Sequence, residues 1–155
     1  MNRLFLMFSL AAGLISCQPG GHVYYKHLDL SPQVEWLKKD SREFKITIKD
    51  INIAYKMSLS FRYAEGYQYQ YAKVKVMETS PSGKRTVKEY DLKVRKDNGD
   101  YIGDAGLDIW DSDHLIEPGK KYTEPGTYTY VIEHNMTIDP LPFAMEIGII
   151  LDKVK

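Results

Sequence analysis

The chain has little of what several classes of function require. Only one of its 155 residues is cysteine, which excludes an internal disulfide and a multi-cysteine metal site. Neither sign of charge is in excess, since Lys plus Arg and Asp plus Glu number 21 each. A chain without a net positive field lacks the general attraction for nucleic acid, so we expect no nucleic-acid partner.

Alanine and long helical patterns are also scarce. β-branched and aromatic residues, among them 12 tyrosines, greatly outnumber alanine, and such side chains suit the pleated surface of a sheet. With 43% apolar and 27% charged residues the composition is that of an ordinary globular domain. The composition therefore favours one all-β domain.

The first residues have the pattern of a secretion signal. Residues 4–15 carry no charge, follow Arg3 and are too few to cross the roughly 30 Å hydrocarbon core of a bilayer. They run into Leu14-Ile15-Ser16-Cys17, which resembles the bacterial lipobox and implies cleavage before Cys17 and its lipidation. The alternatives are an ordinary signal with an incidental cysteine, or a cysteine buried in the core. We expect a signal peptide over residues 1–16, a lipidated tether over residues 17–22 and one domain over residues 23–155.

Short runs with period-two alternation follow, separated by turn residues, which is typical of sandwiches and barrels. The longest run spans Tyr55 to Tyr63, where odd-numbered residues are apolar and even-numbered ones, such as Ser60, are polar. We predict an antiparallel β-sandwich, Ig-like or jelly-roll-like, of about seven or eight strands with its polar strand residues exposed. The predicted core comprises Trp36, Phe44, Ile46, Ile48, Met57, Leu59, Phe61, Tyr128, Tyr130, Ile147 and Ile149.

Several local signals refine this picture. Ser80-Pro81-Ser82-Gly83 predicts a turn between strands, and Asn98-Gly99 predicts a hairpin leading into a short strand. Residues 145–151 are nearly continuous in apolar side chains, which favours a central strand. Residues 31–39 are predicted to form a short helix, with Ser31 as its N-cap and Pro32 in its first turn.

No catalytic or cofactor-binding constellation emerges. The sequence has no Gly-x-Ser-x-Gly elbow, and its four histidines lack the spacing of a zinc protease, so we expect neither an enzyme nor a bound cofactor or metal. Six aspartates fall between Asp97 and Asp113, which leaves a calcium site as an alternative. Aspartate is also a common turn residue, and that interpretation is favoured.

Tyrosines gather at Tyr63, Tyr67, Tyr69 and Tyr71, where alternation would give a strand one aromatic face. Such a face can stack on sugar rings or bind a protein partner. Ordinary cross-strand packing is the favoured alternative.

From Trp36 onward the order of landmarks resembles the gliding-motility lipoprotein GldH family of the Bacteroidetes. The landmarks are Trp36, Phe44-x-Ile46-x-Ile48-x-Asp50, Tyr55-x-Met57-x-Leu59-x-Phe61-Arg62, Tyr67-x-Tyr69, Pro81-x-Gly83, Gly99-x-Tyr101-x-Gly103, Asp108-Ile109, Gly126-x-Tyr128, His134-x-Met136, Leu141 and Met145-Glu146-Ile147-Gly148. The chain departs from the family pattern at Tyr101, Thr137 and Phe143, where Trp, Arg and Gly are usual.

The resemblance implies a non-enzymatic lipoprotein that acts as a protein-binding or scaffold component of gliding and type IX secretion machinery. We expect membrane attachment through Cys17 and envelope proteins as partners, with a carbohydrate-binding surface lipoprotein as the alternative. The residues after Cys17 lack an acidic run, which favours a periplasm-facing outer-membrane lipoprotein. The candidate partner-binding residues are Arg62, Tyr67, Tyr69, Tyr71 and Trp110.

Overall fold

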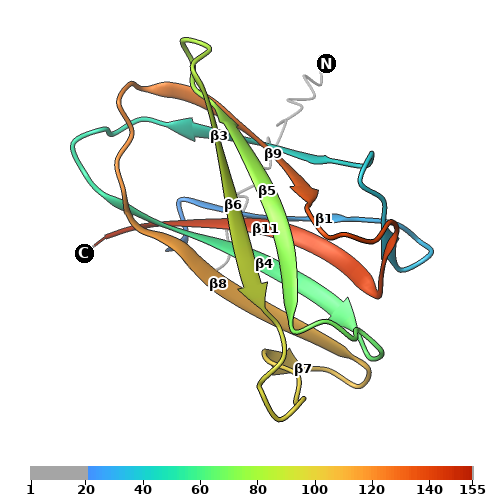
Figure 1. The fold of residues 1–155 in the computed structure, drawn as a ribbon. Coiled ribbons are helices and arrows are strands. Elements are labelled where there is room, and N and C mark those ends of the chain that lie inside the picture. Colours follow the sequence, from blue (N-terminus) through green and yellow to red (C-terminus); the bar gives the residue numbers. More distant parts are fainter. Residues whose placement is uncertain (1–20, 155) are drawn as a thin grey trace, which may run out of the picture.

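The computed structural model describes residues 21–154, which form two antiparallel sheets packed face to face (Figure 1). The first sheet has the strand order β1-β11-β4-β8-β7, the second has β3-β9-β5-β6, and β10 pairs with β2 at one end. The strands are β1 (Tyr24–Asp29), β2 (Glu35–Trp36), β3 (Arg42–Ile48), β4 (Tyr55–Ala64), β5 (Tyr71–Thr79), β6 (Arg85–Lys93), β7 (Asp104–Ala105), β8 (Ile109–Lys120), β9 (Gly126–His134), β10 (Leu141–Pro142) and β11 (Ala144–Lys153). The prediction of an all-β sandwich is confirmed.

The core lies between the two sheets. Every predicted core residue, from Trp36 to Ile149, is buried. The odd-numbered residues of β4 face this core beside the odd-numbered residues of β11, because Leu59 pairs with Ile149 and Phe61 with Ile147. Alternation therefore located the core face of β4 correctly.

The predicted turns and the central strand are also present. Residues 80–84 connect β5 to β6, with Gly83 at a φ of +87° that favours glycine. Arg95 pairs with Tyr101 across the predicted Asn98-Gly99 hairpin. As predicted for a nearly continuous apolar run, β11 lies inside its sheet, between β1 and β4.

The helix predicted over residues 31–39 is wrong. The Ser31 hydroxyl accepts a hydrogen bond from the Gln33 amide at 3.1 Å, which makes a turn, and Val34 then adopts a φ of +57° that no α-helix allows. β2 follows and pairs Trp36 with Leu141. Burial of the Trp36 ring and pairing with a distant strand override the local helix signals.

Two further expectations need correction. The alternation analysis did not predict β8, whose Asp111 and Asp113 lie in a strand rather than in turns. Ser60 was expected to be exposed, but only 3% of the residue is. It lies on β4, which is flanked within its sheet by β11 on one side and β8 on the other.

In the part of the chain that the structure describes, no helix is long and apolar enough to cross a bilayer. The predicted signal peptide, Cys17 and most of the tether lie outside the described residues.

Candidate functional site

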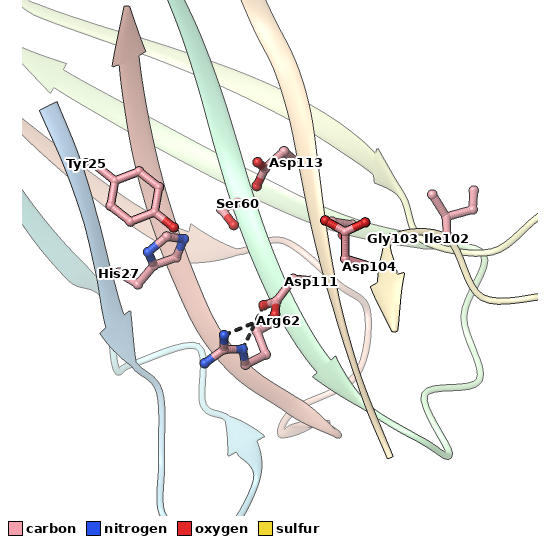
Figure 2. A pocket seen from close by; sticks show the side chains of 10 residues that line it. Tyr25, His27, Ser60, Arg62, Ile102, Gly103, Asp104, Asp111 and Asp113 are labelled. Atoms are coloured by element: carbon pink, nitrogen blue, oxygen red, sulfur yellow. Dashed lines mark hydrogen bonds and ion pairs between the residues drawn. The ribbon is translucent and has the colours of Figure 1, made fainter. Parts of the chain in front are cut away.

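The outer face of the first sheet has a hollow of about 410 Å³ (Figure 2). Successive strand residues point to opposite faces, so Ser60 and Arg62 of β4 point away from the core that Leu59 and Phe61 enter. The hollow is lined by Tyr25, His27, Ser60, Arg62, Ile102, Gly103, Asp104, Asp111, Ser112 and Asp113.

Strand register determines the shape of this hollow. One row of paired residues crosses the sheet from His27 through Gly148 and Ser60 to Asp113. The two middle positions carry the smallest side chains, whereas the outer two carry larger ones. The floor of the hollow is therefore low and its sides are raised.

The next row is charged. It runs from Glu146 through Arg62 and Asp111 to Asp104, on β11, β4, β8 and β7. The Arg62 Nε and Nη2 atoms donate to the two Asp111 carboxylate oxygens at 2.7 and 3.0 Å, and Nη1 donates to Glu146. The hydrogen bonds to Asp111 above all, and then Glu146, raise the pKa of the guanidinium above its ordinary value. Arg62 is thus a charged group whose donors are already engaged on both sides.

His27 and Tyr25 form one side of the hollow. The His27 ring lies over Gly148, where an added Cβ would come within 2.8 Å of Nε2 of that ring. The Tyr25 ring meets His27 edge-on, with the ring centroids 4.8 Å apart, and stacks on His22 at 5.2 Å. Both neighbours of the Tyr25 ring are therefore imidazoles of this chain.

Two aspartates and a serine are among the polar side chains of the hollow that have no partner in the described residues. Asp104 and Asp113 make no ion pair or side-chain hydrogen bond within residues 21–154, and the same part of the chain offers no hydrogen-bond partner to the Ser60 hydroxyl. Figure 2 shows the Ser60 oxygen between the Tyr25 and His27 side and the two aspartates. These three groups are available to a ligand.

Ser60, His27 and Asp113 do not form a catalytic relay. In a nucleophilic triad the carboxylate orients the histidine that in turn activates the serine. Here Asp113 lies on the far side of Ser60 from His27, and no hydrogen bond joins His27 to Ser60. Among residues 21–154, moreover, no three His, Cys, Asp or Glu side chains are arranged to hold a metal ion, so the calcium alternative lacks a ligand set in this part of the chain.

Tyr63 and Tyr67 do not form an exposed aromatic face, because both are fully buried, in agreement with the favoured interpretation of packing. The Tyr63 hydroxyl lies within hydrogen-bond distance of the Val94 and Ile102 carbonyls, and the Tyr67 hydroxyl donates to the Tyr71 carbonyl at 3.2 Å. Burial raises the pKa of Tyr63 to about 12. Tyr67 therefore cannot serve as a partner-binding side chain in this fold.

The other candidate residues do not form one patch. Tyr69 and Trp110 are half-buried against the core, and Trp110 pairs with Tyr63 on the inward face of β8. Arg62 lies on the opposite, outward face of the same sheet. Tyr71 is half-buried at the start of β5. A binding role for Arg62, Tyr69, Tyr71 and Trp110 stays a prediction.

The comparisons with known proteins point to one family. The family model described as "GldH lipoprotein" matches residues 22–151. None of the curated proteins matches the chain.

Solved structures give only distant likenesses. A family GH115 4-O-methyl-α-glucuronidase with specificity for decorated arabinogalactans is 13% identical, with a TM-score of 0.39. That match covers 97% of this chain and 20% of the enzyme. A structure of infectious bursal disease virus, Gx strain, is 11% identical over 85% of this chain and 36% of the viral chain, with a TM-score of 0.25. Neither likeness is close enough to indicate a function.

Proposed function

The chain belongs to the GldH lipoprotein family, and from this membership we propose that it is a non-enzymatic, lipid-anchored component of the cell envelope. Its role is to bind other envelope proteins as part of the machinery for gliding and type IX secretion. The observation that carries the proposal is the family match, which extends over nearly all of the described residues.

The leader supports a lipid anchor at Cys17. Each buried methylene of an acyl chain contributes about 0.8 kcal/mol, so several chains on one cysteine make membrane attachment effectively permanent. The four residues Gln18 to Gly21 span at most about 13 Å at roughly 3.3 Å per residue. The sandwich is then held beside the membrane, and we propose the periplasmic face of the outer membrane.

The geometry of the hollow supports a binding role rather than catalysis. Its polar groups without a partner in the described residues include two carboxylates, the Ser60 hydroxyl and the His27 imidazole, and no hydrogen bond joins that imidazole to that hydroxyl. The carbohydrate alternative has lost the tyrosine face on which it depended, since Tyr63 and Tyr67 are buried. We therefore do not retain it as a second function.

Complementation of a gene deletion in a gliding host tests this proposal. We expect the deletion to abolish colony spreading and the wild-type gene to restore it. The Cys17→Ala gene should not restore spreading, and its protein should no longer be found in the membrane pellet. The matched control is Ser16→Ala, which keeps the cysteine. Normal spreading of the deletion strain would contradict a role in motility, and a Cys17→Ala protein that stays in the washed pellet would contradict the anchor.

A further inference from the structure

We infer that the hollow on the outer face of the first sheet binds a basic side chain, lysine or arginine, of a protein partner. The inference rests on the proposed protein-binding function and assigns the chemistry of the contact.

Charge is the first argument. Asp104, Asp111 and Asp113 line the hollow, and its one cation, Arg62, is shared between Asp111 and Glu146. Four carboxylates thus surround one guanidinium, and the two that Arg62 does not contact have no ion pair in the described chain. An excess of negative charge without a cationic partner complements a positive group.

The spacing of the carboxylates supports a single occupant. Asp111 and Asp113 project from the same face of β8 two residues apart, about 7 Å along the strand, and Asp104 lies one strand away at about 5 Å. Asp104 and Asp113 therefore flank Asp111 on the same outward face, and both Asp111 oxygens already accept from Arg62. A planar guanidinium can also bond two carboxylates at once, as Arg62 does within this chain.

Ser60 is a second and independent indication of a ligand. Its side chain is almost fully buried, yet its hydroxyl has no partner among residues 21–154 and lines the floor of the hollow. That hydroxyl opens onto the hollow, so a donor group of a ligand placed there can bond to it. Lysine and arginine side chains carry only donors, which matches an acceptor hydroxyl flanked by carboxylates.

The shape of the hollow admits a basic side chain. Gly148 and Ser60 keep its floor low, and a flexible basic side chain needs only such depth and acceptors. Tyr25, the aromatic residue of the lining, packs against His22 and His27 but is 49% exposed, so a sugar is an alternative occupant that the test must distinguish.

The test uses the lipoprotein purified from its membrane in a nonionic detergent. The probes are two short glycine-rich peptides with blocked ends, one with a central arginine and one with a central lysine. Their controls carry citrulline and acetyl-lysine, which keep the shape but remove the charge. We expect both basic peptides to shift the NMR amide signals of the residues that line the hollow, less so at high salt, and the neutral peptides to leave them unchanged.

Matched variants locate the contact. Asp104→Asn with Asp113→Asn removes two carboxylates from the hollow, and we expect the basic peptides to bind about tenfold more weakly. Glu89→Gln with Asp91→Asn removes two carboxylates from exposed positions of β6 on the other sheet, and binding should be unchanged. Ser60→Ala should also weaken binding, by a smaller factor.

Three results of the peptide experiments would overturn the inference. The first is equal binding of charged and neutral peptides, and the second is an equal loss in the two double variants. The third is a response of the same signals to neutral oligosaccharides but not to the basic peptides, which would identify a sugar site. Co-purification separates this inference from the proposed function. If the Asp104→Asn, Asp113→Asn variant keeps all partners of the wild type, the inference fails and the function stands; if the wild type has no partner, the function fails.

Discussion

Leu59 lies near the middle of β4 with its side chain fully buried, whereas Ser58, its neighbour, lies on the outward face. Truncating a buried leucine removes apolar contacts and leaves a cavity. We expect Leu59→Ala to lower the free energy of unfolding by about 2–5 kcal/mol and Ser58→Ala by less than about 0.5 kcal/mol, as measured by denaturant titration. Equal losses would mean that the two faces of β4 are assigned wrongly.

His134 is a buried polar residue whose surroundings disfavour its charge. Neither ring nitrogen has a hydrogen-bond partner in the described chain, and the ring lies edge-on to Trp36 with the centroids 5.5 Å apart. Burial lowers the pKa of this imidazole below its ordinary value and Lys38 adds to that, although Asp139, 3.7 Å from Nε2, acts the other way. The folded state therefore keeps His134 neutral.

This burial makes stability depend on pH. The unfolded chain takes up a proton at His134 near pH 6.5, about its ordinary pKa, whereas the folded chain does so only at lower pH. Stability should be greatest above this value and fall as the pH drops below it. The melting temperature should fall between neutral and mildly acidic pH, and His134→Leu should make that fall smaller. Each kcal/mol of pH-dependent free energy of unfolding that the substitution removes corresponds to about 2–4 °C. Melting curves of the two proteins that shift by the same amount would contradict this account.

Tyr67 shows where alternation stops being informative. The odd-numbered residues up to Tyr63 are inward as predicted, but the chain then turns, with the Tyr67 amide bonded to the Ala64 carbonyl at 3.2 Å and Gly66 at a φ of +100°. The turn folds the Tyr67 ring back against Phe61 and Tyr63. A pattern that assumes one continuous strand cannot predict this reversal.

At the level of elements, β1 is an edge strand whose fit depends on one glycine. Each residue of β1 pairs with β11, and a Cβ at Gly148 would come within 2.9 Å of the Lys26 carbonyl and closer still to the His27 ring. The backbone atom cannot move without displacing the strand.

We therefore expect Gly148→Ala to destabilise the protein by about 1–3 kcal/mol and to speed hydrogen exchange of the β1 amides above all. Gly119→Ala, at a site in β8 with no atom within 4 Å of the added methyl group, is the matched control and should change neither. Unchanged exchange in β1 of the Gly148→Ala protein would show that the strand tolerates the methyl group.

Among the strands that were not predicted, β8 and β2 escaped prediction for identifiable physical reasons. The inward face of β8 includes Ser112 and His114, which conceal its alternation, and register shifts opposite Met57 accommodate Pro118 inside the strand. β2 consists of two residues and pairs with Leu141 and Pro142, more than a hundred positions away. No local sequence pattern indicates that β2 forms, or that residues 31–39 do not form the expected helix.

At the scale of the whole molecule, local motifs could be predicted from the sequence, whereas sites built from distant strands could not. The leader and Cys17 form a short local motif, and the order of strand landmarks indicated the family that the comparison confirms. The hollow instead combines side chains from strands that are far apart in the sequence, and only the register of β1, β11, β4 and β8 brings His27, Ser60 and Asp113 into one row. Of its lining residues, only Arg62 is a candidate partner-binding residue from the sequence.

The central claim is that this lipoprotein works by holding other envelope proteins. The most direct test is chemical crosslinking in intact cells of the native host, followed by purification of the lipoprotein from the membrane and identification of what is bound. We predict a defined complex with envelope proteins that is recovered with the wild type and lost with Cys17→Ala, because removing the anchor removes the protein from its partners. Recovery of the wild-type lipoprotein alone, at full yield and without a crosslinked partner, would contradict the account.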